Sequence, residues 1–300
     1  MPDVAIMIEG QHGVDWERWR AVVETVEDAG FHGLFRSDHF TNPEGPVMDS
    51  LELWTSLTWL ADNTDRLEFG PLVTPASFRD PIFTARMGKE VDDLSGGRLT
   101  LGVGAGWQER EHETFGYDLL PVPARFDRFE ESLHVIEGLL RSDDPVTVDG
   151  EYYELDEAEL LPRTEHETPI LVGGNGRQRT LPLAARFADE WNGVFVGADD
   201  YADLNDRLDD LLDAEGRDPD EVRRSIMTRV VFGRDEAELD AALDGDDADD
   251  LREMGFVVGT ASEVAAQVED LGDAGADRVM LQWLDVEDLD RLRGLADAVA

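Results

Sequence analysis

The chain has 300 residues and a formal net charge of −43 at pH 7, because 69 residues are Asp or Glu and only 26 are Lys or Arg. A hydrophobic fraction of 41% is enough for a large core and argues against an acidic disordered protein. The absence of cysteine excludes disulfides and thiolate catalysis, and no apolar run reaches the roughly 18 residues of a transmembrane helix.

Short apolar segments alternate with amphipathic ones along the chain. Residues 4–8 form a continuous apolar run, as expected of a parallel strand that is covered on both faces. Apolar residues from Trp16 to Val26 then recur at helical spacing, and Gly30 predicts the end of that helix. Further strands are expected at residues 33–39, 67–73, 99–103, 169–174, 191–196, 225–232 and 278–283. Further helices are expected from residues 49–50 onward, from Asp80-Pro81 to Gly96-Gly97, and over residues 124–140 and 289–299.

Eight strand–helix units predict an α/β fold, a (β/α)8 TIM barrel that forms one domain over residues 1–300. A small insertion between strands four and five is expected to contain a hairpin, with strands at residues 146–148 and 152–155 around Asp149-Gly150. An open, doubly wound sheet is the alternative fold. It is disfavoured because no short Gly-rich dinucleotide turn follows the first strand.

A Gly-rich loop, Gly173-Gly174-Asn175-Gly176-Arg177, joins the fifth strand to a helix that starts near Thr180. Its glycines let the backbone approach a ligand closely, and the new helix offers free N–H groups at the positive end of its dipole. Arg177 and Arg179 add two cations, so the loop predicts a site for an anionic group, with phosphate as the best candidate. The alternative is a turn required only by the strand-to-helix geometry, with Arg179 paired to surface acids.

Asp38 and His39 close the second predicted strand, and His39 is the one histidine of six at the carboxyl end of such a strand. In a barrel this end carries the functional groups. His39 could relay a proton near neutral pH, and Asp38 could accept a hydrogen bond from a cofactor. Both are therefore candidate catalytic residues; the alternative is a structural hydrogen-bonded pair.

The fourth strand leads into Gly104-Ala105-Gly106-Trp107, a turn that would let a flat ring lie against the backbone with Trp107 as a wall. The alternative is a tight turn with a core tryptophan. We interpret the following acids, Glu109, Glu111 and Glu113, as a solvated face because acids are so abundant in this chain. No cluster of His, Asp and Glu has metal-ligand spacing.

Four segments in order resemble the coenzyme F420-dependent branch of the luciferase-like monooxygenase superfamily. They are Ser37-Asp38-His39-Phe40, Gly70 to Thr74 followed by Arg79-Asp80-Pro81, Leu94 to Trp107, and Gly173 to Thr180 with its continuation to Asp189. The resemblance spans essentially the whole chain, and it implies a usually dimeric TIM barrel that holds a deazaflavin ring in its mouth.

The resemblance also implies roles for individual residues. Asp38 would contact the cofactor, and His39 would transfer a proton. A bulge at Leu72, Val73 and Thr74, with a non-proline cis peptide, would lie behind the ring. Gly104, Ala105 and Gly106 would line the ring, and Gly173, Gly174, Asn175, Gly176 and Arg177 would hold the phosphate.

The activity that this resemblance implies is hydride transfer between F420 and a small organic substrate. One alternative is an FMN-dependent monooxygenase, and another is a flavin- or deazaflavin-binding protein without turnover. Sugar-phosphate dehydrogenases of the family have Glu at the position of Trp107 and Trp soon after the Asp-His pair, where this chain reads Thr41-Asn42-Pro43-Glu44. Glucose-6-phosphate is therefore not the expected substrate.

The distribution of charge adds expectations about location and partners. Lys89 is the only lysine and the acids are spread along the chain, which predicts adaptation to a salt-rich cytoplasm, since charges are screened within about 3 Å at 1 M salt. Residues 1–3 lack the basic region of a secretory signal, so a cytoplasmic location is expected. Nucleic acid and anionic membranes are not expected partners of so acidic a surface.

Overall fold

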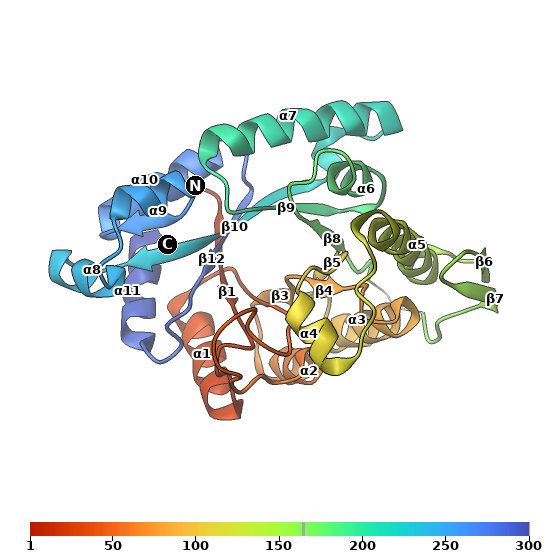
Figure 1. The fold of residues 1–300 in the computed structure, drawn as a ribbon, viewed down its shortest axis with the longest axis horizontal. Coiled ribbons are helices and arrows are strands. Elements are labelled where there is room, and N and C mark those ends of the chain that lie inside the picture. The colour runs from red at the N-terminus through yellow and green to blue at the C-terminus, as the bar shows by residue number, and fades with distance from the viewer. Residues whose placement is uncertain (164–165, 300) are drawn as a thin grey trace.

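A computed structural model describes residues 1–163 and 166–299, and in these residues eight parallel strand positions form a barrel ringed by helices (Figure 1). The hydrogen-bonded order is β3-β2-β1-β12-β10-β9-β8-β5-β4. β3 and β4 are consecutive halves of one strand position, and a bridge between Phe69 and Leu99 also joins the ends of the sheet, so the barrel closes. The strands are β1 (Asp3–Ile8), β2 (Gly33–Arg36), β3 (Glu68–Pro71), β4 (Thr74–Pro75), β5 (Leu101–Gly104), β8 (Ile170–Gly173), β9 (Glu190–Val194), β10 (Arg223–Phe232) and β12 (Arg278–Gln282). The predicted TIM barrel is confirmed.

The helices begin and end at the residues that the sequence marks. Asp15 accepts hydrogen bonds from the first turn of α1, which ends at Gly30 with φ 91°. Asp80 caps α3 in the same way, with Pro81 at its first position and Gly96 at its end. The larger outer helices are α1 (Trp16–Ala29), α2 (Leu53–Asn63), α3 (Pro81–Ser95), α5 (Val122–Arg141), α6 (Thr180–Phe187), α7 (Ala198–Glu215), α10 (Ala261–Asp273) and α11 (Leu289–Val299). Shorter helical segments are α4 (Glu109–Phe115), α8 (Glu236–Leu243), α9 (Ala248–Glu253) and the 3-10 turn η1 (Pro219–Glu221).

The apolar side chains form a large layer between the sheet and the helices and a smaller cluster inside the barrel. The inner cluster contains Ala5, Met7, Phe35, Leu72, Leu171, Met227 and Met280. Continuous apolar strands supply both layers, since alternate residues point to opposite faces. Three members of the inner cluster, Met7, Leu72 and Met227, line a cavity at the carboxyl ends of the strands.

Three strands differ from the sequence-based expectation, and the helices α4, α7, α8, α9 and α10 were not predicted. β2 ends at Arg36, so residues 37–39 lie beyond the strand, and the third strand is broken between Pro71 and Thr74. A short strand, β11 (Val257–Gly259), pairs with β10 and was not predicted. The insertion is as expected: β6 (Val146–Asp149) and β7 (Glu154–Ala158) form the antiparallel hairpin.

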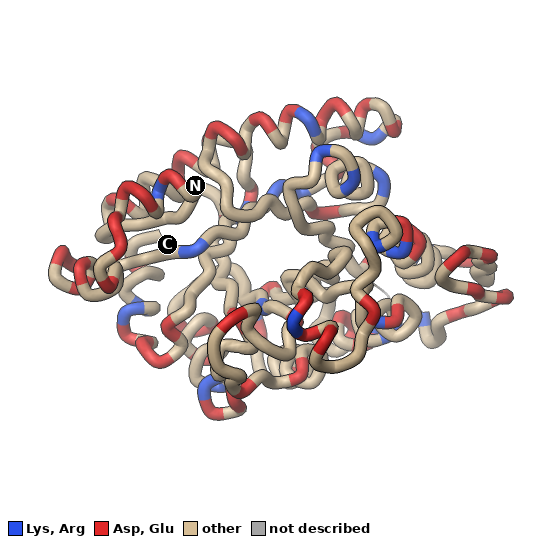
Figure 2. The backbone as a smooth tube through the Cα atoms, viewed as in Figure 1, with Lys and Arg blue, Asp and Glu red and all other residues tan. Residues whose placement is uncertain are grey.

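Acidic residues cover the outer helices on all sides of the barrel (Figure 2). α7 alone carries Asp199, Asp200, Asp203, Asp206, Asp209, Asp210, Asp213 and Glu215. Over the described part of the chain, no helix combines the length and the apolarity that a membrane crossing would need.

Candidate active site at the carboxyl ends of the strands

The carboxyl ends of the barrel strands surround a cavity of about 490 Å³. Apolar side chains and glycines form most of its wall, and the polar lining residues are Glu9, Ser37, Glu111, Arg125, Thr180, Asn192 and His39. Of the residues predicted for the site, His39, Leu72, Val73, Gly104, Ala105, Gly106, Gly173 and Gly174 line the cavity. Asp38, Thr74, Asn175, Gly176 and Arg177 do not. This is the end of the barrel at which TIM-barrel enzymes place their chemistry.

His39 is bonded to a buried carboxylate. Its Nδ1 lies 2.9 Å from Oε1 of Glu111, and the other oxygen of Glu111 accepts the backbone N–H of Phe40 at 3.0 Å. The Glu111 side chain is 1% exposed and that of His39 is 15% exposed. The interpretation of Glu111 as part of a solvated face is therefore wrong, because one side of α4 is buried against the segment after β2.

This contact determines the protonation of His39. Burial alone would lower the pKa of His39, but the hydrogen bond and the charge of Glu111, with smaller contributions from Glu9 and Asp38, raise it above its usual value. With Nδ1 directed at Glu111, Nε2 is the ring nitrogen left for a ligand. The pair can hold a proton and transfer it near neutral pH.

Asp38 has a different environment from His39. Its carboxylate accepts two hydrogen bonds from Arg79, at 2.7 and 2.9 Å, and one from Thr74 Oγ1 at 2.6 Å. Both oxygens are thus occupied, and the side chain ties the end of β2 to the bulge. Asp38 thus has structural contacts, but its partners are Arg79 and Thr74 and not His39, the partner that the alternative expected. Its carboxylate is not among the groups that line the cavity.

The bulge between β3 and β4 has the shape that the resemblance implied. The peptide bond between Leu72 and Val73 is cis. The Val73 side chain occupies the space above two glycines: a Cβ on Gly104 would lie 2.6 Å from Val73 Cγ2, and one on Gly173 would lie 3.1 Å from Val73 Cγ1. Glycine is required at these two positions because the bulge approaches them so closely.

The turn after β5 forms one wall of the cavity. Gly106 has φ 85°, and a Cβ there would lie 2.1 Å from Ser77 Oγ. Trp107 lines the cavity, is 60% exposed, and meets the His39 ring edge-on at a centroid distance of 5.6 Å. Trp107 is therefore a wall residue, and the alternative of a core tryptophan is wrong.

The Gly-rich loop after β8 reaches the cavity through Gly173, Gly174 and the first residue of α6, Thr180. Asn175 instead bridges to β9, since its amide donates to Val194 O at 2.7 Å and its carbonyl accepts Val194 N–H at 2.9 Å. Arg177 forms an ion pair with Asp203, and Arg179 forms one with Asp127 at 2.6 Å. Both arginines that were predicted to bind phosphate are thus paired with aspartates at the surface. For Arg179 this is the alternative that the sequence left open.

Glu9, Asn192 and Arg125 also contribute polar groups to the lining. Glu9 ends β1 and accepts hydrogen bonds from Gln11 and Gln282. Asn192 on β9 is fully buried, and its Oδ1 has no hydrogen-bond partner in the described structure. Arg125 lies in the first turns of α5. Glu9 and Asn192 stand at or near strand ends, which was the available signal, whereas nothing in the sequence distinguishes Arg125 from its helical neighbours.

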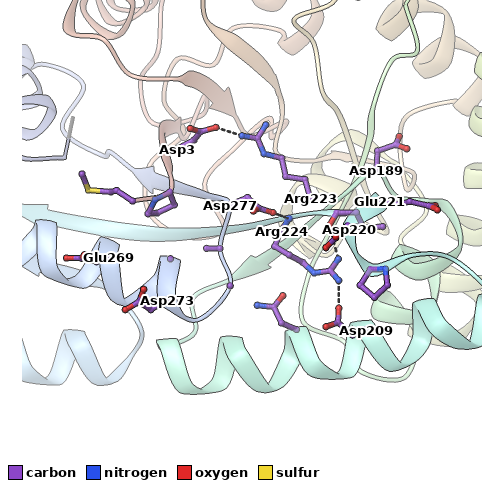
Figure 3. Close-up of a pocket in the computed structure, with 18 residues that line it drawn as sticks. Asp3, Asp189, Asp209, Asp220, Glu221, Arg223, Arg224, Glu269, Asp273 and Asp277 are labelled. Atoms are coloured by element: carbon purple, nitrogen blue, oxygen red, sulfur yellow. Dashed lines mark hydrogen bonds and ion pairs between the residues drawn. The ribbon is translucent and has the colours of Figure 1, made fainter.

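A second, more open cavity of about 1010 Å³ lies at the opposite end of the barrel (Figure 3). It is lined by residues that precede or begin strands and by residues of α7 and α10, and eight of the eighteen are acidic. The two arginines in it are already paired: Arg223 with Asp3, and Arg224 with Asp209 at 2.5 Å. This end of a TIM barrel serves stability, so the smaller cavity at the carboxyl ends is the candidate active site.

The chain is similar to known proteins in both sequence and fold. Residues 4–252 match the model of the luciferase-like monooxygenase family. An F420-dependent glucose-6-phosphate dehydrogenase of Kineococcus radiotolerans is 30% identical over 71% of this chain and 63% of its own length. A phthiodiolone/phenolphthiodiolone dimycocerosates ketoreductase of Mycobacterium kansasii is 34% identical over 66% of this chain and 54% of its own. The matched region thus spans less than two thirds of these relatives.

Solved structures share the fold over the whole chain. An F420-dependent secondary alcohol dehydrogenase, in complex with an F420-acetone adduct, superposes with a TM-score of 0.86 at 20% identity, covering 100% of this chain and 99% of that one. An EDTA monooxygenase from Chelativorans superposes with a TM-score of 0.80 at 16% identity, covering 98% and 93%. At these identities the likeness establishes the barrel and its topology.

Proposed function

This chain belongs to the luciferase-like monooxygenase family, and we propose that it is an F420-dependent oxidoreductase that acts as a single-domain barrel. It would transfer hydride between the deazaflavin and a small organic substrate. The observation that carries the proposal is the His39–Glu111 pair, which holds a proton at the wall of a largely apolar cavity. Named relatives that use F420 as dehydrogenases support the choice of cofactor.

The residues of the cavity fit a flat, tricyclic ring. Gly104, Gly173 and the Val73 bulge that packs against them line the cavity, and Met7 and Met227 add apolar lining. The partnerless Oδ1 of Asn192 offers an acceptor for a ring N–H. When bound, the deazaflavin supplies the hydride chemistry, and the protein supplies binding, orientation and exclusion of water.

The residues in and around the cavity would then have separate tasks. His39 exchanges a proton with the substrate oxygen through Nε2, while Glu111 fixes the ring through Nδ1 and favours the charged imidazolium. Asp38 is a positioning residue that holds Thr74 and Arg79, and through them the bulge. Trp107 shields His39 from solvent on one side.

The FMN-dependent monooxygenase remains the second candidate, because a monooxygenase from Streptomyces nodosus is 27% identical over 92% of this chain. Fluorescence titration with F420 and, separately, with FMN in molar salt tests the choice. Tight binding of F420 alone supports the proposal, and preference for FMN overturns it in favour of the monooxygenase. His39→Ala should abolish turnover and keep cofactor binding; a parent protein without turnover on any alcohol or ketone tested would indicate a binding protein.

We propose further that the protein is a homodimer joined through the outer surface of α2 and α3. Phe83 is 62% exposed there, beside Trp54, Met87 and Leu94, in a groove of about 680 Å³. Exposed apolar side chains gathered in one groove can mark a protein–protein contact. Light scattering should give twice the monomer mass, and Phe83→Glu should return the monomer. A cytoplasmic location and the lack of nucleic-acid or membrane partners remain predictions from composition.

A further inference from the structure

Among the described residues, Arg125 is the one Arg or Lys that lines the barrel-mouth cavity, the cavity at the carboxyl ends of the strands. It lies near the start of α5, between the turn after β5 and the segment that leads into the helix. Its Nε donates to Leu120 O and its Nη1 to Gly106 O, both at 3.0 Å. Two backbone carbonyls thus fix the plane of the guanidinium.

Arg125 has no carboxylate partner among residues 1–163 and 166–299. Arg177 and Arg179 differ in this respect, because both are paired with aspartates. Burial and the neighbouring Arg128 lower the pKa of Arg125, and the charge of Glu109 opposes them only in part. A ligand that brings negative charge would complement this guanidinium.

The carbonyl partners leave donor capacity unused. A guanidinium has five N–H donors in a planar fork, and the bonds to Leu120 and Gly106 use two of them. Nη2 makes no hydrogen bond within the described structure, and neutral carbonyls do not cancel the charge. A pre-oriented guanidinium with a free edge is suited to phosphate or carboxylate oxygens.

We propose that Arg125 binds the anionic oxygens, phosphate or carboxylate, of the molecule that occupies the barrel mouth. It thereby takes the role that the sequence assigned to Arg177. The inference rests on the proposed function in one respect, namely that this cavity is the ligand site. The anion has two possible sources: the phosphate-bearing tail of the cofactor, or an acidic group of the substrate.

The test compares Arg125→Gln with Arg177→Gln, a matched control whose arginine is exposed and paired. F420 and its phosphate-free deazaflavin riboside are titrated into each variant at one fixed salt concentration, after circular dichroism has shown that the variants are folded. If the cofactor tail is the source, Arg125→Gln should weaken F420 binding about tenfold or more. The riboside should then bind all variants alike, and Arg177→Gln should change neither affinity appreciably.

If the substrate is the source, F420 affinity should be unchanged, and inorganic phosphate should raise the melting temperature of the F420-loaded parent but not of Arg125→Gln. Equal F420 affinities together with equal phosphate effects would overturn the inference. Failure of the proposed function looks different: the parent would not bind F420 at all. The phosphate arm, run on the ligand-free protein, would then still decide whether Arg125 is an anion site, with Arg125→Lys expected to retain part of the effect.

Discussion

Nδ1 of His39 lies 2.9 Å from Oε1 of Glu111, 72 residues further along the chain. The carboxylate is buried on α4, and its second oxygen is occupied by the N–H of Phe40. Glu111 therefore holds both the ring and the backbone that carries it. The contact gives His39 a fixed orientation and a proton that is bound more tightly than in the unfolded chain.

Replacing Glu111 with Gln should lower the pKa of His39, because the amide keeps a hydrogen bond but removes the negative charge that outweighs burial. The titration of the His39 ring protons by NMR, assigned with His39→Ala, measures this directly in the ligand-free protein. Where the rate of turnover depends on the protonation of His39, its pH profile should move to lower pH in the same variant. Glu109→Gln, on the same helix, is the matched control and should leave the titration in place.

The effect on stability has a definite sign. Since the folded state raises the pKa of His39 from 6.5, the pair stabilises the fold fully at pH below that value. This contribution is lost as the pH rises through the raised value. A His39 titration that is identical in the parent and in Glu111→Gln would show that the pair is not electrostatically coupled.

Gly104→Ala should weaken binding of the ring ligand and destabilise the fold. The new Cβ would lie 2.6 Å from Val73 Cγ2, so the bulge must shift. Gly197→Ala is the control, because Gly197 has φ −74° and nothing lies within 4 Å of a Cβ there. The double variant Gly104→Ala with Val73→Ala should regain much of the loss in F420 affinity. If Gly104→Ala bound F420 as tightly as the parent, the bulge would not be part of the ligand site.

The architecture could be predicted because its signals are local. Apolar runs, helical spacing and the capping residues Asp80, Pro81 and Gly96 each specify an element from neighbouring residues alone. The strand β11 was not predicted, because the apolar run from Val257 to Gly259 is too short to be distinguished from a segment of a buried helix. The break in the third strand at Leu72 and Val73 was predicted from the family resemblance, since the apolar periodicity does not indicate it.

The candidate site was predictable in position but less so in the roles of its side chains. Glu111 could not be distinguished among 69 acids, since its burial depends on α4 lying against the segment after β2. The carboxylate of Asp38 is hydrogen-bonded to Arg79, which lies 41 residues away, so no local sequence pattern reveals this contact. Arg125 lines the cavity because α5 begins beside the turn after β5, which is a property of the folded chain.

Asp38 and Arg79 should be strongly coupled. A double-mutant cycle with Asp38→Asn and Arg79→Met should give a coupling free energy of about 1–3 kcal/mol, because the pair is bidentate and Asp38 is 5% exposed. The exposed pair Arg177–Asp203 is the control and should give less than about 1 kcal/mol. Coupling in the first pair no larger than in the second would contradict a structural role for Asp38.

Arg278→Met should strongly destabilise the barrel. The side chain is 1% exposed, pairs with Glu190 at 3.1 Å and with Glu68, and lies over the Phe35 ring. Its removal leaves Glu190 buried without its counter-ion, a loss of about 3–5 kcal/mol in unfolding free energy. Adding Glu190→Gln should recover part of the loss in denaturant unfolding. A double variant less stable than Arg278→Met would show that the charge of Glu190 is satisfied by other groups.

The melting temperature should rise steeply between millimolar and molar salt. With a net charge of −43 dispersed over the outer helices, the folded state repels itself more than the expanded chain does. At molar salt this repulsion is screened beyond about 3 Å. Circular dichroism melts in KCl and NaCl measure the effect, and a variant of α7 with Asp206, Asp210 and Asp213 changed to Asn should need less salt for the same melting temperature. An unchanged melt over that range would mean that the acids are balanced locally by the ion pairs of the fold, and adaptation to salt would no longer explain the composition.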